Sequence, residues 1–229
     1  MGNTLRVFRT SRVLTTSWVL RPLLAVLAVL AVCMAAPASA DTRAPKTDGR
    51  ALATATFAGG CFWCMEPPFD KLEGVVSTTS GYTGGHGTPT DARVSAGGTG
   101  HAEAVRVVYD ENRIDYARLL DVFWRNVDPL DAGGQFCDRG DQYRSAIFYE
   151  TEEQKRLAER AKAELEALRR FDRPIVTAVV PAAAFHPAED YHQDYYQKSP
   201  LKYNFYRFNC DRDRRLEELW GGPDTVAVR

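Results

Sequence analysis

The chain has 229 residues, of which 45% are hydrophobic, 29 are basic and 30 are acidic. The formal net charge of −1 at pH 7 argues against binding to nucleic acid or to a membrane surface, because both partners select basic protein surfaces. The length and the apolar content are sufficient for one domain with a full hydrophobic core.

The first 40 residues have the pattern of an export signal. They contain four arginines and no acidic residue, and an apolar run from Leu23 to Ala36 follows the arginines. This run has the length of a signal-peptide core and is short for a membrane span. It ends in a small-residue cleavage signal before Asp41. We therefore expect an exported protein, periplasmic or extracellular, with no membrane contact after cleavage; an uncleaved N-terminal membrane anchor is the alternative.

We divide the chain into a signal peptide (1–40), a flexible leader (41–50), one folded domain (51–222) and a tail (223–229). In chain order, hydrophobic periodicity and turn residues predict a strand at 51–60, a helix at 64–74, strands at 75–85 and 101–110, a helix at 114–128, a strand at 144–150, a helix at 151–169, a strand at 173–182 and a helix at 190–199. Pro67 and Pro68 are expected in the first turn of the first helix. These elements intermix without a repeated βαβ rhythm. We therefore predict an α+β fold, a two-layer sandwich of helices on a mixed β-sheet.

Two cysteines, Cys61 and Cys64, are separated by two aromatic residues and follow a pair of glycines. A zinc site usually needs a second close pair of ligands, and Cys137 and Cys210 are isolated in the sequence. A thioredoxin-like redox pair fits the order strand, Cys-x-x-Cys, helix, since a helix N-terminus lowers a thiol pKa. A structural disulfide and a single nucleophile with a helper group are the other two interpretations.

Three polar residues elsewhere favour a nucleophile with helpers. Glu103 shares one face of a predicted strand with Val105 and Val107, so burial should raise its pKa and suit it to proton donation. A solvent-facing glutamate at the start of the strand explains the pattern equally well. Asp138 and Tyr143 lie in a glycine-bounded loop that could present them to a ligand, although ordinary turn and strand-start positions are the simpler interpretation.

Taken together, these pieces resemble the peptide-methionine (S)-S-oxide reductase family. The similar stretches are GCFWCMEPPFDKLEGV (60–75), SGYTGG (80–85), GTGHAEAVRVVYD (98–110), FWRNVDPLDAGGQFCDRGDQYRSAIFY (123–149) and AEDYHQDYYQKSP (188–200). They follow the family order and cover nearly all of the predicted domain. The resemblance implies an enzyme that reduces the S-epimer of methionine sulfoxide, free or in proteins, and so repairs oxidative damage.

The resemblance also implies roles for single residues. Cys61 matches the nucleophile that attacks the sulfoxide sulfur, and Glu103 matches the acid that protonates the leaving oxygen. Tyr143 matches a hydroxyl that binds the same oxygen. Phe62 and Trp63 match the apolar wall that receives the substrate methyl group.

Two carboxylates complete the comparison with the family pattern. Asp138 matches a residue that helps to hold the substrate backbone. Asp91, in the stretch Thr88-Pro89-Thr90-Asp91, stands where the family usually has a tyrosine that shares the sulfoxide oxygen. Asp91 has no phenol to offer, so either Tyr143 acts alone on the oxygen or the Asp91 side chain turns away.

The implied reaction leaves Cys61 as a sulfenic acid, which a second thiol converts to a disulfide. We favour Cys64 as this resolving cysteine, with Cys210 second and Cys137 also expected close to the site. Thioredoxin or another dithiol would then restore the enzyme, with no bound cofactor and no metal. We expect a monomer whose partners are oxidised proteins and peptides and this thioredoxin-like reductant. An exported thiol-disulfide oxidoreductase that uses Cys61 and Cys64 is the alternative function.

Overall fold

The computed structural model describes Gly49 and residues 51–221, which belong to one compact unit. The predicted signal peptide and tail, and the leader apart from Gly49, lie outside the described residues. Within the described part of the chain, no helix is long and apolar enough to cross a membrane.

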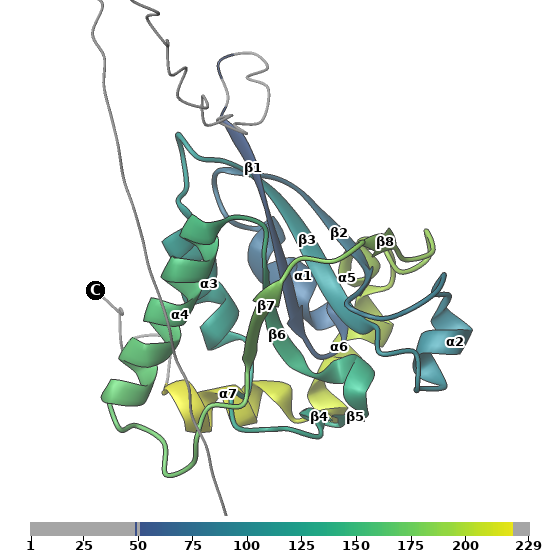
Figure 1. The fold of residues 1–229 in the computed structure, drawn as a ribbon. Helices are drawn as coiled ribbons and strands as arrows, with labels where there is room; N and C mark the ends of the chain where they lie inside the picture. Colours follow the sequence, from purple (N-terminus) through teal and green to yellow (C-terminus); the bar gives the residue numbers. More distant parts are fainter. Residues whose placement is uncertain (1–48, 50, 222–229) are drawn as a thin grey trace, which may run out of the picture. The chain divides into compact units, whose positions relative to one another are not determined.

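A six-stranded mixed sheet with the strand order β7-β6-β1-β3-β2-β8 forms one layer of the fold (Figure 1). Its strands are β1 (Leu52–Gly59), β2 (Val75–Thr83), β3 (Ala102–Asp110), β6 (Ser145–Tyr149), β7 (Ala178–Pro181) and β8 (His186–Pro187). The pair β6–β7 is parallel and the other neighbours are antiparallel. The predicted mixed sheet is confirmed.

The helices and short elements extend beyond those that the sequence pattern predicts. The helices are α1 (Phe62–Asp70), α2 (Asp91–Ser95), α3 (Tyr116–Arg125), α4 (Glu152–Ala167), α5 (Tyr195–Lys198), α6 (Pro200–Asn209) and α7 (Arg212–Trp220). A 3-10 turn, η1 (Asp141–Tyr143), follows a small hairpin of β4 (Gly134–Gln135) and β5 (Asp138–Arg139).

Two predicted element boundaries and the predicted position of two prolines were wrong. The helix expected at 190–199 is only the single turn α5, and the strand expected at 173–182 begins at Ala178. Pro67 and Pro68 lie inside α1 beyond its first turn. The helix continues around them because six of its nine residues are buried, so tertiary packing outweighs the local cost of proline.

An aromatic core joins the helical layer to the sheet. The ring of Phe57 on β1 stacks on Phe69 of α1 at 5.1 Å and on Phe123 of α3 at 5.3 Å between centroids. Val105 and Val107 of β3 belong to the same fully buried cluster. Each buried side chain of this size contributes about 1.5–3 kcal/mol. This packing fixes α1, and with it the cysteines at its start, against β1 and β3.

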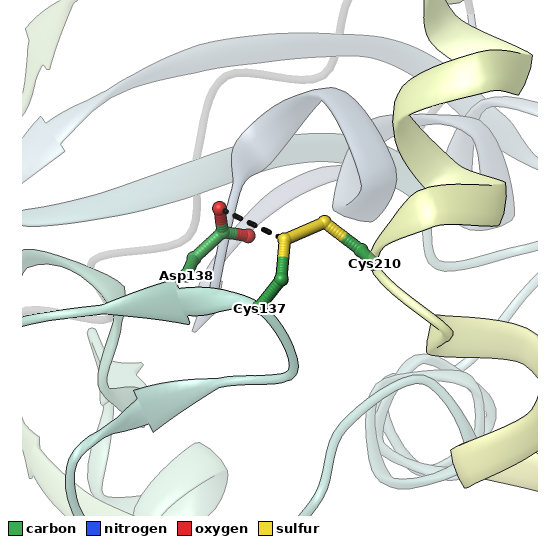
Figure 2. Close-up of side chains that lie close together, drawn as sticks. All are labelled: Cys137, Asp138 and Cys210. Atoms are coloured by element: carbon green, nitrogen blue, oxygen red, sulfur yellow. Dashed lines mark hydrogen bonds between the residues drawn. A yellow bond between two sulfur atoms is a disulfide. The ribbon is translucent and has the colours of Figure 1, made fainter.

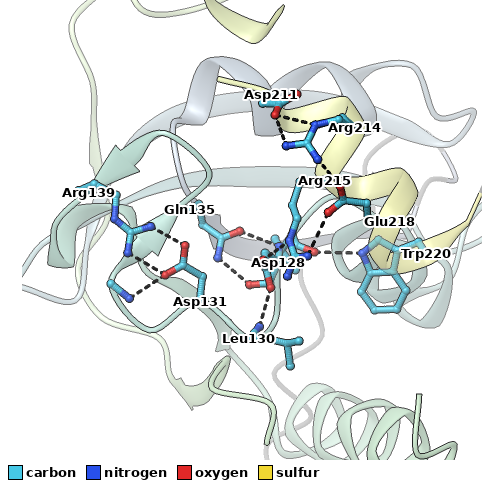
Figure 3. A network of polar contacts seen from close by, with 12 residues as sticks. Asp128, Leu130, Asp131, Gln135, Arg139, Asp211, Arg214, Arg215, Glu218 and Trp220 are labelled. Atoms are coloured by element: carbon cyan, nitrogen blue, oxygen red, sulfur yellow. Dashed lines mark hydrogen bonds and ion pairs between the residues drawn. The ribbon is translucent and has the colours of Figure 1, made fainter. Parts of the chain in front are cut away.

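A polar network fastens the segment after α3 to α7 (Figure 3). The Asp128 carboxylate accepts hydrogen bonds from the Leu130 amide (2.9 Å) and from Arg215 Nε (2.8 Å). The Gln135 side chain bonds both the amide (2.8 Å) and the carbonyl (2.7 Å) of Asp128, and Trp220 Nε1 donates to the Val127 carbonyl (3.1 Å). The β4–β5 hairpin is thereby held between the end of β1 and the last helix.

Candidate active site

Cys61 lies at the point where β1 turns into α1. It is the N-cap residue of α1 and is only 6% exposed. The preceding Gly60 has φ +85°, and a Cβ there would lie 2.6 Å from Gln135 Cβ, so both the backbone conformation and the close packing require glycine. The strand, the glycine turn and the helix together place the thiol at a helix N-terminus, where unpaired amides favour negative charge.

Glu103 of β3 reaches the same helix end. Its Oε2 accepts the Phe62 amide hydrogen at 3.0 Å, so a carboxyl group from a distant strand caps α1 beside Cys61. The residue is 5% exposed. Burial, opposed by the hydrogen bond from the Phe62 amide and aided by the nearby charges of Asp138 and Asp91, raises the pKa of Glu103 to about 8. Of the two positions considered for Glu103, the structure has the buried one and not the solvent-facing one.

The Cys61 thiol is held in its protonated form in the free protein. Burial raises its pKa well above the usual value, and Glu103, Cys64 and Asp138 add to this effect in that order. The neighbouring Tyr206 hydroxyl has the opposite effect and lowers the pKa. The site therefore contains both an undissociated carboxylic acid and an undissociated thiol near neutral pH.

Asp138 and Tyr143 also belong to this site. The Tyr206 hydroxyl of α6 donates a short hydrogen bond to Asp138 Oδ2. The pKa of Tyr143 is raised by burial and then by the charges of Glu103, Asp138 and Cys61, so its hydroxyl lies within the electrostatic field of these groups. The structure thus brings together the four polar residues that the sequence analysis singled out from three separate segments.

An aromatic cluster surrounds the Trp63 indole. The ring of Tyr195 stacks on Trp63 at 3.8 Å between centroids, and Tyr206 meets it edge-on at 5.7 Å. Trp63 Nε1 donates to His192 Nδ1 at 3.0 Å, and the His192 ring lies 4.9 Å from that of Phe62. Phe62 is buried and Trp63 is partly exposed, so the indole is the part of this wall that a ligand reaches first.

The sequence analysis missed His192, Tyr195 and Tyr206 as members of the site. The first two lie in the stretch 188–200, which carried part of the family resemblance, and that stretch was the available signal. Tyr206 lies four residues before Cys210 in an ordinary amphipathic pattern, and its sequence position gave no such signal.

The cysteines are in two different states. Cys137 and Cys210 form a disulfide that joins the β4–β5 hairpin to the end of α6, with Asp138 directly beside it (Figure 2). Cys61 and Cys64 are free and buried. The sulfurs of Cys137 and Cys210 form a cluster with an Asp138 oxygen, but they are bonded to each other and are not free metal ligands. In this state Cys64 is the free thiol next to Cys61, and the identity of the resolving cysteine stays a prediction.

Asp91 is occupied by contacts within its own surroundings. Its Oδ1 accepts from Ser95 Oγ at 3.0 Å, and its Oδ2 accepts from the Tyr191 hydroxyl at 2.9 Å. Its charge still raises the pKa values of Glu103 and Tyr143. The side chain is thus engaged by neighbours on both oxygens, while its charge acts on the acid of the site.

Known proteins with similar sequences identify the family to which the chain belongs. Residues 53–223 match the family model described as peptide methionine sulfoxide reductase. The peptide methionine sulfoxide reductases MsrA of Streptococcus agalactiae and Listeria monocytogenes are 52% and 49% identical over 167 and 172 residues, which cover 72% and 75% of this chain and 98% and 97% of theirs.

Solved structures of the same kind share the fold. Reduced Mxr1 from Saccharomyces cerevisiae has a TM-score of 0.61 at 31% identity, covering 69% of this chain and 90% of its own. Methionine sulfoxide reductase A of Corynebacterium diphtheriae has a TM-score of 0.59 at 32% identity, covering 66% and 76%.

A buried thiol at a helix N-terminus, with a buried carboxylic acid beside it, defines a thiol-dependent oxidoreductase site. The chain belongs to the peptide methionine sulfoxide reductase family. It is an enzyme that reduces methionine sulfoxide.

Proposed function

We propose that this enzyme reduces the S-epimer of methionine sulfoxide, free or within proteins, with Cys61 as nucleophile and Glu103 as acid. The observation that carries this proposal is the Glu103 carboxyl group beside the Cys61 thiol. The group is buried and hydrogen-bonded to the Phe62 amide, and its pKa of about 8 keeps it protonated at neutral pH. A sulfoxide oxygen leaves only when it is protonated, and a carboxylic acid with a raised pKa supplies that proton near neutral pH.

In the first step the Cys61 sulfur attacks the sulfur of the sulfoxide. An S–S bond forms transiently while the oxygen accepts the Glu103 proton, and the proton released by Cys61 restores the acid. The S–O bond then breaks, and the hydroxide released attacks the Cys61 sulfur while the S–S bond breaks and methionine leaves. Cys61 is left as a sulfenic acid and has lost the two electrons that the sulfoxide sulfur gains.

The surroundings of Cys61 give a physical basis for epimer selection. Phe62 and Trp63 would pack against the substrate methyl group, and Tyr143 would donate to the oxygen from the side of Glu103. Asp138, held by Tyr206, would accept a hydrogen bond from the substrate backbone amide. The R-epimer exchanges methyl and oxygen, so it would place a polar atom on the aromatic rings and leave the acid without a partner.

In the second step Cys64 would attack the Cys61 sulfenic acid, and a disulfide and water would form. Thioredoxin or another dithiol would reduce this disulfide by thiol–disulfide exchange, leaving both cysteines as thiols and the dithiol oxidised. Cys64 starts one helical turn from Cys61, and its amide already donates to the Cys61 carbonyl at 3.0 Å, so closure needs little backbone movement. The enzyme itself then needs no bound cofactor.

We also propose that the enzyme is exported and acts as a monomer on oxidised proteins. The support is the signal-like pattern of residues 1–40. In an oxidising compartment recycling would require a dedicated dithiol partner, since glutathione and cytosolic thioredoxin do not supply reducing equivalents there.

A parallel assay tests the proposed reaction. Loss of a methionine sulfoxide peptide, resolved into its two epimers, is followed with dithiothreitol while insulin reduction is measured on the same preparation. We expect much faster turnover of the S-epimer than of the R-epimer, and no turnover of either in a Cys61→Ser variant. Insulin reduction without sulfoxide loss would instead establish a general thiol-disulfide oxidoreductase.

A further inference from the structure

Behind the indole of Trp63 lies a buried imidazole, that of His192, which is 5% exposed. The Trp63 Nε1–H group is a donor only, so the His192 Nδ1 that it reaches at 3.0 Å must act as the acceptor. A neutral imidazole then carries its hydrogen on Nε2. The pKa of His192 is lowered, chiefly by burial, which favours this neutral form.

The Nε2–H group that results is buried. Within the described part of the chain Nε2 has no hydrogen-bond partner, and Asp91 Oδ2 lies 3.6 Å away. This distance is too long for a hydrogen bond but close enough for the carboxylate to stabilise the N–H dipole. Asp91 and Glu189 are the charged groups that face His192, and both raise the pKa of the imidazole against the larger effect of burial.

The Asp91 carboxylate is itself held in place on α2. The backbone amide of Asp91 donates to Glu189 Oε1 at 2.9 Å, and the hydroxyl groups of Ser95 and Tyr191 donate to the two carboxylate oxygens of Asp91. Thr90 caps α2 through a bond from the Arg93 amide to its side chain. The carboxylate is therefore held by contacts other than His192, and its Oδ2 is the oxygen nearest to the imidazole ring.

We propose that Asp91 is a positioning residue which, through His192, fixes the orientation of Trp63 and so sets the epimer selectivity of the substrate pocket. The negative charge of Asp91 stabilises the His192 Nε2–H edge, and His192 in turn holds the indole by its Nε1–H group. The His192 ring also lies against Phe62, so a loosened imidazole would free both aromatic residues of the methyl wall. The selectivity part of this proposal rests on the proposed function, and the orientation part does not.

Two substitutions separate the acceptor from its charge. Asp91→Ala removes both, whereas Asp91→Asn keeps a carbonyl oxygen on the same carbon skeleton and removes only the charge. Asp190→Ala is the matched control, because Asp190 is exposed and lies two residues from His192. The hydrogen bond described for Asp190 is accepted by its backbone carbonyl, which the substitution keeps.

The kinetic readout uses both epimers of a methionine sulfoxide peptide. We expect Asp91→Ala to raise KM for the S-epimer about 10-fold with kcat within about 2-fold, because one oriented contact in the pocket is lost. The ratio of kcat/KM between the epimers should fall with it. Asp91→Asn should change both values as Asp91→Ala does, because both variants lose the charge, and Asp190→Ala should equal the parent.

The second readout needs no activity. Hydrogen–deuterium exchange of the Trp63 indole Nε1–H, assigned in NMR spectra by comparison with Trp63→Phe, should accelerate in both Asp91→Ala and Asp91→Asn and stay slow in Asp190→Ala. In a His192→Phe background Asp91→Ala should add nothing to KM, because the pathway through the ring is already removed.

Unchanged KM, selectivity and indole exchange in Asp91→Ala would overturn the proposal. Parent-like KM, selectivity and indole exchange in Asp91→Asn would also overturn it, because the charge of Asp91 would then not matter. Absence of sulfoxide reduction by the parent enzyme would remove the proposed function alone, and the indole exchange would still decide the orientation.

Discussion

Glu103 combines two tasks that usually exclude each other. One oxygen accepts the Phe62 amide hydrogen at the start of α1, which favours an ionised carboxylate. Burial nevertheless raises the pKa to about 8, so the group is protonated at neutral pH. A carboxylic acid solves this conflict because its carbonyl oxygen accepts from the amide while its hydroxyl remains available as a donor. The residue can therefore order the helix start and still supply a proton to the substrate.

The raised pKa of Glu103 predicts the alkaline limb of the pH profile. The acid form is the active one, so kcat/KM should be maintained below about pH 8 on this limb and fall as the pH rises through that value. Glu103→Gln should lower kcat/KM by about 10²–10⁴-fold and abolish the limb, while its amide oxygen still accepts from Phe62 and preserves the fold. Initial rates between pH 6 and 10 measure this.

The exposed Glu111, which directly follows β3, offers the matched control, and Glu111→Gln should leave the pH profile of kcat/KM unchanged. A parent-like rate in Glu103→Gln would remove Glu103 as the acid.

Cys64 can be tested as the resolving cysteine by separating one turnover from many. Cys64→Ser should consume about one equivalent of sulfoxide, leave Cys61 as a sulfenic acid and then stop when thioredoxin is the only reductant, since no partner thiol closes the disulfide. Rapid-quench product analysis and a sulfenic-acid probe measure the two quantities. A matching single burst in Cys210→Ser, together with full turnover in Cys64→Ser, would transfer the role to Cys210.

Among the elements, those that depend on local pattern could be predicted from the sequence. The alternation in β3 and the helical spacing in α3 are repeated over nine and ten residues, and both were found where expected. The elements α2, α5 and β8 are two to five residues long and depend on contacts with distant segments. No local periodicity distinguishes such elements from loops.

The same reason explains which site residues could be predicted. Cys61 and Glu103 follow from motifs that are contiguous in the chain. The contact between Trp63 and His192 joins residues 129 positions apart, and its geometry depends on how α5 packs on α1. Sequence spacing within either segment carries no information about that packing.

The disulfide is an element-scale constraint, because it ties the β4–β5 hairpin to α6 across a loop of 73 residues. Loop-closure entropy predicts that Cys137→Ser with Cys210→Ser lowers the free energy of unfolding by about 4 kcal/mol. Urea denaturation of parent and variant measures this. KM for the substrate should rise as well, since Asp138 adjoins Cys137 and its partner Tyr206 lies one turn before Cys210.

Dithiothreitol should lower the stability of the parent to that of the double variant and leave the variant unchanged. Equal stability of the oxidised parent and the double variant would show that the bond adds no constraint.

At the scale of the whole molecule, one buried side chain connects the last helix to the first strand and helix. Arg212 of α7 is 1% exposed, and its Nη2 donates to the carbonyls of Gly59 (3.3 Å) and Asn126 (2.6 Å) and lies 3.0 Å from Met65 Sδ. Its guanidinium lies over the Phe136 ring at 4.3 Å. Four segments of the chain meet at this residue.

Arg212→Met should therefore destabilise the fold far more than a similar change on the surface. Two buried carbonyls lose their donor, which predicts a loss of about 2–4 kcal/mol in the free energy of unfolding. Arg214→Met on the exposed side of the same helix removes only solvent-exposed ion pairs with Asp211 and Glu218, which contribute little to stability. Equal losses in the two variants, measured by urea denaturation, would contradict the central place of Arg212.

The contact between α1 and α7 has a consequence for how the protein is made. Arg212 and Met65 are 147 residues apart, and a ribosome adding about 5–20 residues per second needs roughly 7–30 s to travel that distance. During this interval Cys61 and Cys64 have been synthesised, while the helices that cover them have not. The nascent chain thus passes through a period in which its two most reactive sulfurs are open to any oxidant nearby, and in the finished enzyme both are buried.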